Sequence, residues 1–198
     1  MFFAKLFTVG ALALSVAAAP LAAPLAKRST SVATVLNDLA AQLDPVIGQI
    51  TDVVGVTQDT NQVATQLSPL VSQAVVIIDG ATSEIQSLTG LPTDQILATV
   101  DGAGTIVVGD LAQLLAAVLA LVLKAVGAVL GALTGDLSGV LVALGPLGVA
   151  LANLLRVVLA LVGGLLEGLL DLVLGLIGSL LPIVIRLNVG VLVSLLRL

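Results

Sequence analysis

The sequence predicts an all-α protein with an amphipathic helical N-terminal half and a Leu/Gly-rich, hydrophobic helical C-terminal half. Three observations predict this: apolar residues spaced alternately four and three apart in residues 29–110, long Leu- and Ala-rich segments in 111–198, and Gly or Pro signals between those segments. The chain of 198 residues is 59% hydrophobic and 10% charged. In ordinary soluble proteins about 45–50% of the residues are hydrophobic and about 25% are charged, so this chain has much apolar surface that has to be hidden from water.

Residues 1–18 have the pattern of a secretory signal peptide. Lys5 supplies the positive charge, Leu6 to Ala19 form a short apolar core, and small residues favour cleavage after Ala18. The apolar core is too short for a typical membrane span. The alternative is an uncleaved membrane anchor.

Residues 19–28 are predicted to be a pro-segment. The segment is rich in Ala and Pro and ends at the dibasic pair Lys27–Arg28, which suits a furin- or kexin-type protease and would leave Ser29 as the mature N-terminus. In the alternative interpretation, Lys27 and Arg28 flank a membrane segment.

Residues 29–110 form an acidic amphipathic helical region with nine carboxylates and no Lys or Arg. Two apolar seams with heptad spacing predict two helices, and a polar link near Gln58–Asn61 makes an antiparallel pair the simplest arrangement. The seams are Val32, Leu36, Leu39, Leu43, Val46, Ile50 and Val53, then Val63, Leu67, Leu70, Ala74 and Ile77. Asp38, Asp44, Asp52 and Asp59 fall at outer positions of this register.

Prolines and glycines predict interruptions in this half. Pro45 and Pro69 each follow a good N-cap residue, so we expect kinks or short breaks there. A third helix is expected to begin near Thr93–Asp94 and to end before the glycines of Asp101–Gly104.

Residues 111–198 form a hydrophobic helical region in which 31 of 88 residues are leucine. The breakers Leu144–Gly145–Pro146, Gly163–Gly164 and Leu181–Pro182 are expected to divide it, and Gly135 to Gly139 is expected to form a turn. Asn188 to Ser194 alternates well enough to be a strand. Glycines four residues apart are candidates for close helix packing, although two of them could belong to the turn: Gly127, Gly131, Gly135, Gly139, Gly164 and Gly168.

Composition argues against an enzyme. The chain has no Cys, His, Trp or Tyr, and its three Phe lie in the first seven residues. This excludes thiol nucleophiles, His-centred triads and Cys/His zinc sites. The carboxylates lack the spacing of a calcium loop, and we expect no metal or other cofactor. The acidic balance argues against nucleic-acid binding. Lys124 lies in the most apolar stretch, and we expect it to snorkel or pair with a carboxylate rather than act as a base.

The two unlike halves predict a molecular amphiphile. An apolar side chain gains about 1.5–3 kcal/mol on burial, so the leucines of the second half cannot all face water. The acidic half can cover part of them with its own apolar seams. Self-association, or adsorption at an air–water interface or a hydrophobic solid, would satisfy the rest.

The layout of signal peptide, Ala/Pro-rich pro-segment ending in Lys27–Arg28, Ser/Thr/Asp-rich half and cysteine-free Leu/Gly/Val-rich half resembles a family of secreted hyphal proteins of mushroom-forming fungi. The resemblance implies a noncatalytic structural protein of the hyphal wall or extracellular matrix. Such a protein would support aerial growth and attachment to hydrophobic surfaces, as hydrophobins do, but without their cysteines. No binding or catalytic residue is carried over.

Three alternatives stay open at this point. A multi-pass membrane protein would have spans near 111–133, 140–162 and 165–185, with charged residues within or close to those spans as the main argument against it. A lipid carrier would enclose its ligand between helices. A small secreted effector has the same layout.

Overall fold

The computed structural model describes residues 30–56, 59–162, 168–180 and 182. The regular structure of these residues is helical, which confirms the predicted all-α class. The helices are α1 (Val32–Val56), α2 (Thr60–Ser87), α3 (Thr93–Ile96), α4 (Val108–Ala132), α5 (Ser138–Val162) and α6 (Leu169–Ile177), followed by a 3₁₀ turn at Gly178–Leu180. The predicted signal peptide, the pro-segment and the strand alternative at Asn188–Ser194 lie outside the described residues.

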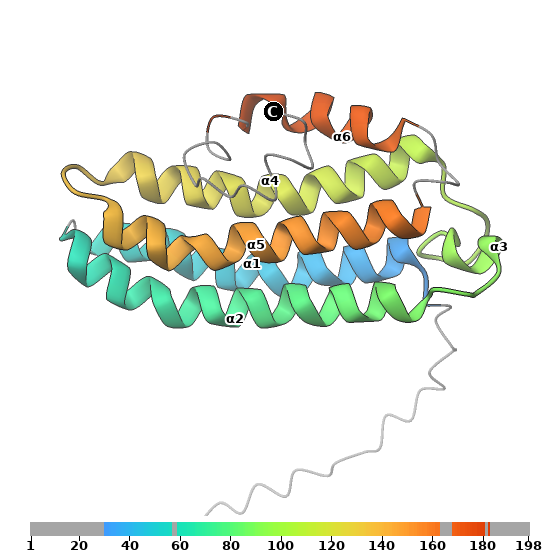
Figure 1. The fold of residues 1–198 in the computed structure, drawn as a ribbon, viewed down its shortest axis with the longest axis horizontal. Helices are drawn as coiled ribbons and strands as arrows, with labels where there is room; N and C mark the ends of the chain where they lie inside the picture. Colours follow the sequence, from blue (N-terminus) through green and yellow to red (C-terminus); the bar gives the residue numbers. More distant parts are fainter. Residues whose placement is uncertain (1–29, 57–58, 163–167, 181, 183–198) are drawn as a thin grey trace, which may run out of the picture.

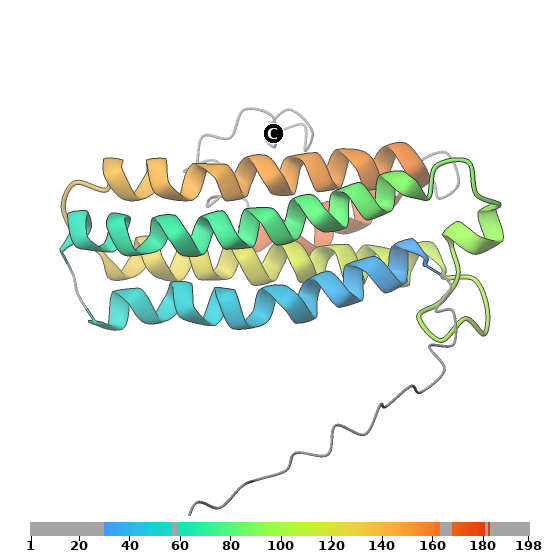
Figure 2. The same cartoon turned by 90° about the horizontal axis from the view of Figure 1, so that it is seen from below.

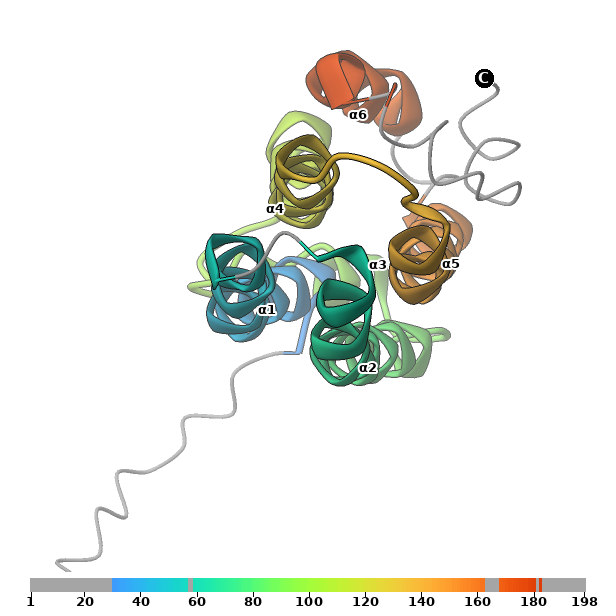
Figure 3. The same cartoon turned by 90° about the vertical axis from the view of Figure 1, so that its left-hand side faces the viewer.

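Four long helices form a bundle of two layers (Figures 1 and 2). α1 and α2 run antiparallel and make up the first layer, which we call the acidic layer. α4 packs along α1 and α5 along α2, and each of these pairs runs parallel (Figure 1). α4, α5 and α6, which packs on α4, are called the apolar layer (Figure 3).

Contacts around the bundle are unequal. The interface between α2 and α5 is the most extensive, and the interfaces of α1 with α2 and with α4 come next. α4 and α5 are joined by a short loop but touch each other at few points. The acidic and apolar regions therefore hold each other more than the apolar helices hold one another.

The link between α2 and α4, residues 88–107, crosses one end of the bundle diagonally (Figures 1 and 3). The expected third helix is present in it only as the four-residue α3. The rest is a small loop closed by an isolated bridge between Ala98 and Thr105, in which the N–H of Ile106 donates to the carbonyl of Leu97 at 2.6 Å.

The core of the bundle is one continuous apolar cluster with side chains from both layers. All seven residues of the first predicted seam are buried in α1. In α2 the prediction holds for Val63, Leu67 and Ala74, whereas Leu70 and Ile77 are half-buried and Val71 and Ile78 are buried instead. α2 packs against α1 on one side and α5 on the other, so its apolar face is wider than a two-helix seam.

The predicted breaks at prolines are wrong, while the kinks predicted as their alternative stay a prediction. α1, α2 and α5 continue through Pro45, Pro69 and Pro146. Each proline removes one backbone donor and leaves the carbonyl four residues before it without a helical partner. All three prolines are exposed, so water can reach the backbone on that side of the helix. A proline on the outer face is thus compatible with a helix held by its buried face.

Candidate functional surface

The two layers carry different charges. The acidic layer, with the N-cap residue of α2, bears six carboxylates and no basic residue: Asp38, Asp44, Asp52, Asp59, Asp79 and Glu84. Five of the six are exposed and Asp38 is half-buried. In the apolar layer and its α4–α5 loop, the described charged residues are Asp110, Lys124, Asp136, Arg156 and Asp171, which nearly cancel. Charge thus distinguishes one side of the bundle from the other.

Exposed apolar side chains give a second contrast. Val142 and Val149 of α5 are 78% and 48% exposed, and Leu172 and Leu176 of α6 are also exposed. No charged residue lies within one helical turn of Val142 or Val149. The acidic layer exposes Val56 and Val76, but Asp52 and Asp79 lie within one turn of them. The sequence analysis missed the α5 valines, whose signal is the spacing of Val142, Pro146 and Val149 along one outer stripe.

A shallow groove of about 370 Å³ runs between α2 and α5. α5 contributes Val142, Ala143 and Pro146 to it, and α2 contributes Thr65, Ser68, Val71 and Ser72 among others. The hydroxyls of Thr65 and Ser72 donate to the carbonyls of Asn61 and Ser68 in their own helix, both at 2.9 Å. Because these donors are already satisfied, the groove is less polar than its residue types indicate.

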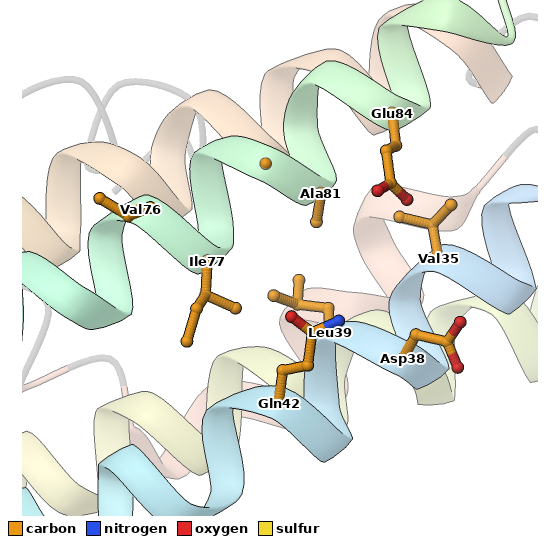
Figure 4. Close-up of a pocket in the computed structure, with 9 residues that line it drawn as sticks. Val35, Asp38, Leu39, Gln42, Val76, Ile77, Ala81 and Glu84 are labelled. Atoms are coloured by element: carbon orange, nitrogen blue, oxygen red, sulfur yellow. The ribbon is translucent and has the colours of Figure 1, made fainter. Parts of the chain in front are cut away.

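A smaller hollow of about 220 Å³ lies between α1 and α2 (Figure 4). Apolar side chains, among them Leu39, Ile77 and Ala81, line it together with Asp38, Gln42 and Glu84. These polar groups supply carboxylates and an amide but no imidazole, thiol or amine. Among the described residues, no group of three or more metal-ligating side chains is assembled.

Two exposed aspartates organise loops. The Thr99 hydroxyl donates to Asp101 at 2.6 Å and the N–H of Ala103 at 3.2 Å, and these hydrogen bonds hold the pKa of Asp101 below its ordinary value. The N–H of Ser138 donates to Asp136 at 2.9 Å, and this bond and one from the Ser138 hydroxyl lower the pKa of Asp136. Both carboxylates act as loop and helix caps, since a charged acceptor strengthens such bonds.

Lys124 and Arg156 are exposed on α4 and α5. Lys124 lies on the narrow outer stripe of α4 with Gln113, Ala117 and Ala128, while the rest of that helix is largely buried. Its position on the outside, despite its apolar sequence context, is what the snorkelling expectation requires.

The candidate packing glycines are divided among several elements. Gly127 and Gly131 lie in α4, Gly135 is in the following loop with φ +100°, and Gly139 is the second residue of α5. A Cβ added at Gly131 would meet nothing within 4 Å, whereas one at Gly139 would lie 3.7 Å from Ala64 Cβ. Gly168 precedes α6 with φ +80°, and Gly164, like Lys27 and Arg28, lies outside the described residues. Of these glycines, Gly139 is the one with a described contact between helices, and packing through the others stays a prediction.

Three described helices are long and apolar enough to cross a membrane: α2, α4 and α5. The predicted spans 111–133 and 140–162 correspond to α4 and α5. The predicted span 165–185 lies partly outside the described residues, and its described part contains the nine-residue α6.

Comparison with protein-family models, with curated proteins and with solved structures found no match for this chain. The resemblance to the secreted hyphal proteins stays a prediction.

Proposed function

We propose that this protein is a secreted, noncatalytic, surface-active structural protein of an extracellular matrix or cell wall. It attaches to hydrophobic surfaces through its apolar layer and keeps its acidic layer in water. The observation that carries this proposal is the polarity of the bundle: six carboxylates and no basic residue on one layer, and two exposed valines of α5, Val142 and Val149, with no charged residue within one helical turn.

Adsorption of the folded bundle follows from the hydrophobic effect. Each exposed valine or leucine of the apolar layer that leaves water contributes up to about 1.5–3 kcal/mol. The carboxylates of the acidic layer would lose hydration if they faced the same surface, which costs free energy. The two contributions act in the same direction, so they orient the bundle with α5 toward the surface and α1 and α2 toward water.

Adhesion of point variants to a hydrophobic solid tests the proposal. Deleting residues 111–198 would remove the helices on which α1 and α2 pack, so the folded chain has to be used. Val142→Thr with Val149→Thr replaces two exposed methyl groups by hydroxyls at similar helix propensity. At about 1 kcal/mol per valine, adsorption should weaken roughly 30-fold.

The matched control is Val56→Thr with Val76→Thr on the acidic layer, where the valines are 80% and 71% exposed. This variant should adhere like the parent chain. Equal weakening of both variants, or of neither, would show that the bundle does not adsorb through α5.

A further inference from the structure

We propose that α4 and α5 can leave the bundle together as a helical hairpin and insert into a lipid bilayer. This goes beyond adsorption of the folded bundle and does not depend on it. The proposal concerns a bilayer of neutral phospholipid, because the excess of carboxylates opposes binding to an anionic membrane.

The two helices fit the bilayer in length and polarity. Each has 25 residues, which gives about 37 Å against about 30 Å of hydrocarbon. Their most apolar stretches have mean hydropathies of 2.4 and 1.9. In the bundle 56% and 50% of those stretches is buried, and a bilayer would also cover their half-buried and exposed apolar residues.

The connections of the bundle allow such a movement. The five-residue loop 133–137 joins α4 to α5, and the long link 88–107 ties α4 to α2. α5 is held mainly by α2, α4 is held by α1 and α6, and α4 and α5 hold each other only slightly. Departure of the hairpin would leave α1 and α2 with their mutual interface, and their amphipathic faces suit the membrane surface.

The two basic residues of the hairpin are displaced from the bilayer centre in opposite directions. Lys124 lies about 12 Å from the loop end of α4, and Arg156 lies about 9 Å from the open end of α5. Both side chains already extend from outer helix faces, and their long stems would reach opposite headgroup regions. Their cost is therefore below that of a charge at the bilayer centre.

Small residues occupy matching positions on the two helices. Gly131 and Gly139 lie one residue from the helix ends that face the loop, and Gly127 and Ala143 lie five residues from them. In a paired hairpin these positions would oppose each other, and small residues permit close packing in lipid. In the bundle, by contrast, Gly139 faces Ala64 of α2.

A disulfide between α2 and α5 tests whether the hairpin has to separate. A Cβ at Gly139 lies 3.7 Å from Ala64 Cβ, within the usual range of disulfides, and the chain has no other cysteine. The full chain carrying Ala64→Cys and Gly139→Cys is mixed with phosphatidylcholine vesicles, floated and washed with carbonate. The reduced protein should float with the vesicles and the oxidised protein should stay in the aqueous fraction.

Flotation of both forms would overturn the proposal, because α5 would then bind without leaving α2, or residues 6–19 would be the part that inserts. Flotation of neither form would overturn it as well. A second measurement uses single cysteines carrying an environment-sensitive fluorophore. The fluorophore at Val149→Cys, at the middle of α5, should be quenched by lipids that carry a quencher in the acyl chain. The fluorophore at Val76→Cys on α2 should not be quenched by them.

Equally shallow quenching at both positions would refute insertion. Adhesion to a hydrophobic solid, which needs no helix separation, should be the same for the oxidised and reduced double-cysteine protein. The two proposals can therefore fail independently.

Discussion

Replacing Leu36 by alanine should destabilise the whole bundle, although Leu36 belongs to the acidic region. Leu36 is 0% exposed in α1 and belongs to the same core cluster as Leu119 of α4, which is 1% exposed. Truncation of a buried leucine to alanine removes its transfer free energy and leaves a cavity, at a cost of about 3–4 kcal/mol. For a chain of this size, that lowers the midpoint of thermal unfolding by about 6–15 °C.

The assay is far-ultraviolet circular dichroism during denaturant unfolding, since the described helices contain no aromatic residue to follow by fluorescence. Leu36→Ala and Leu119→Ala should each move one common transition by a similar amount. Val56→Ala, at a position that is 80% exposed, should change the free energy of unfolding by less than about 0.5 kcal/mol. Two separate transitions, of which each substitution moves only one, would refute the reasoning that the two regions share a core.

Three further results are expected. Asp59→Ala should lower the free energy of unfolding in denaturant by about 1 kcal/mol, because the Asp59 carboxylate accepts from the N–H groups of Asn61 at 2.9 Å and Gln62 at 3.3 Å. An equal loss of stability in Asp52→Ala would argue against capping by Asp59. Gly135→Ala should destabilise the bundle by about 1 kcal/mol because the φ of Gly135 is +100°. Gly48→Ala, in α1 with open space around the position, should stabilise the bundle by about 0.5–1 kcal/mol. Changes in stability of the same sign for both variants would be inconsistent with this backbone argument. The pKa values of Asp101 and Asp136 are lowered, so the stability that these carboxylates contribute is present above their ordinary pKa of 3.8 and is lost as pH falls through the lowered values. In a pH titration of unfolding, the variant with Asp101→Asn and Asp136→Asn should therefore show a weaker loss of stability in acid. An unchanged profile would contradict this argument.

Periodicity predicted the helices better than local breakers did. All seven residues of the first seam are buried because its spacing is regular and follows the inner face of α1, although Ala33, Thr34, Val35 and Ile47 are buried beside them. The breaks predicted at the prolines were wrong because a local rule does not distinguish a proline on the outer face of a helix from one on the buried face. Contact with two neighbours shifted the buried positions of α2 to Val71 and Ile78, and no single-helix pattern contains that information.

The candidate surface was predictable only in part. Acidic outer positions such as Asp44 and Asp52 follow from the heptad register, and both are exposed. The pairing of α1 with α4 and of α2 with α5 depends on how the link crosses the bundle, which local spacing does not determine. Exposure of Val142 and Val149 depends on that pairing, since α5 has few polar side chains, Ser138, Asn153 and Arg156, to mark its outer side.

The diagonal link also affects the order in which the protein can fold. The second and third long helices of the chain, α2 and α4, lie across the bundle from each other, while the most extensive interface joins α2 to α5. During synthesis, α1 and α2 can pair as soon as they emerge, but α2 has to wait for its main partner until α4 and the following loop have been made. Through that interval α4, the most apolar of the candidate membrane-spanning helices, has α1 as its main partner. A chain of this topology is exposed to aggregation before it is complete, so its yield should depend on chaperones that bind apolar helices during translation.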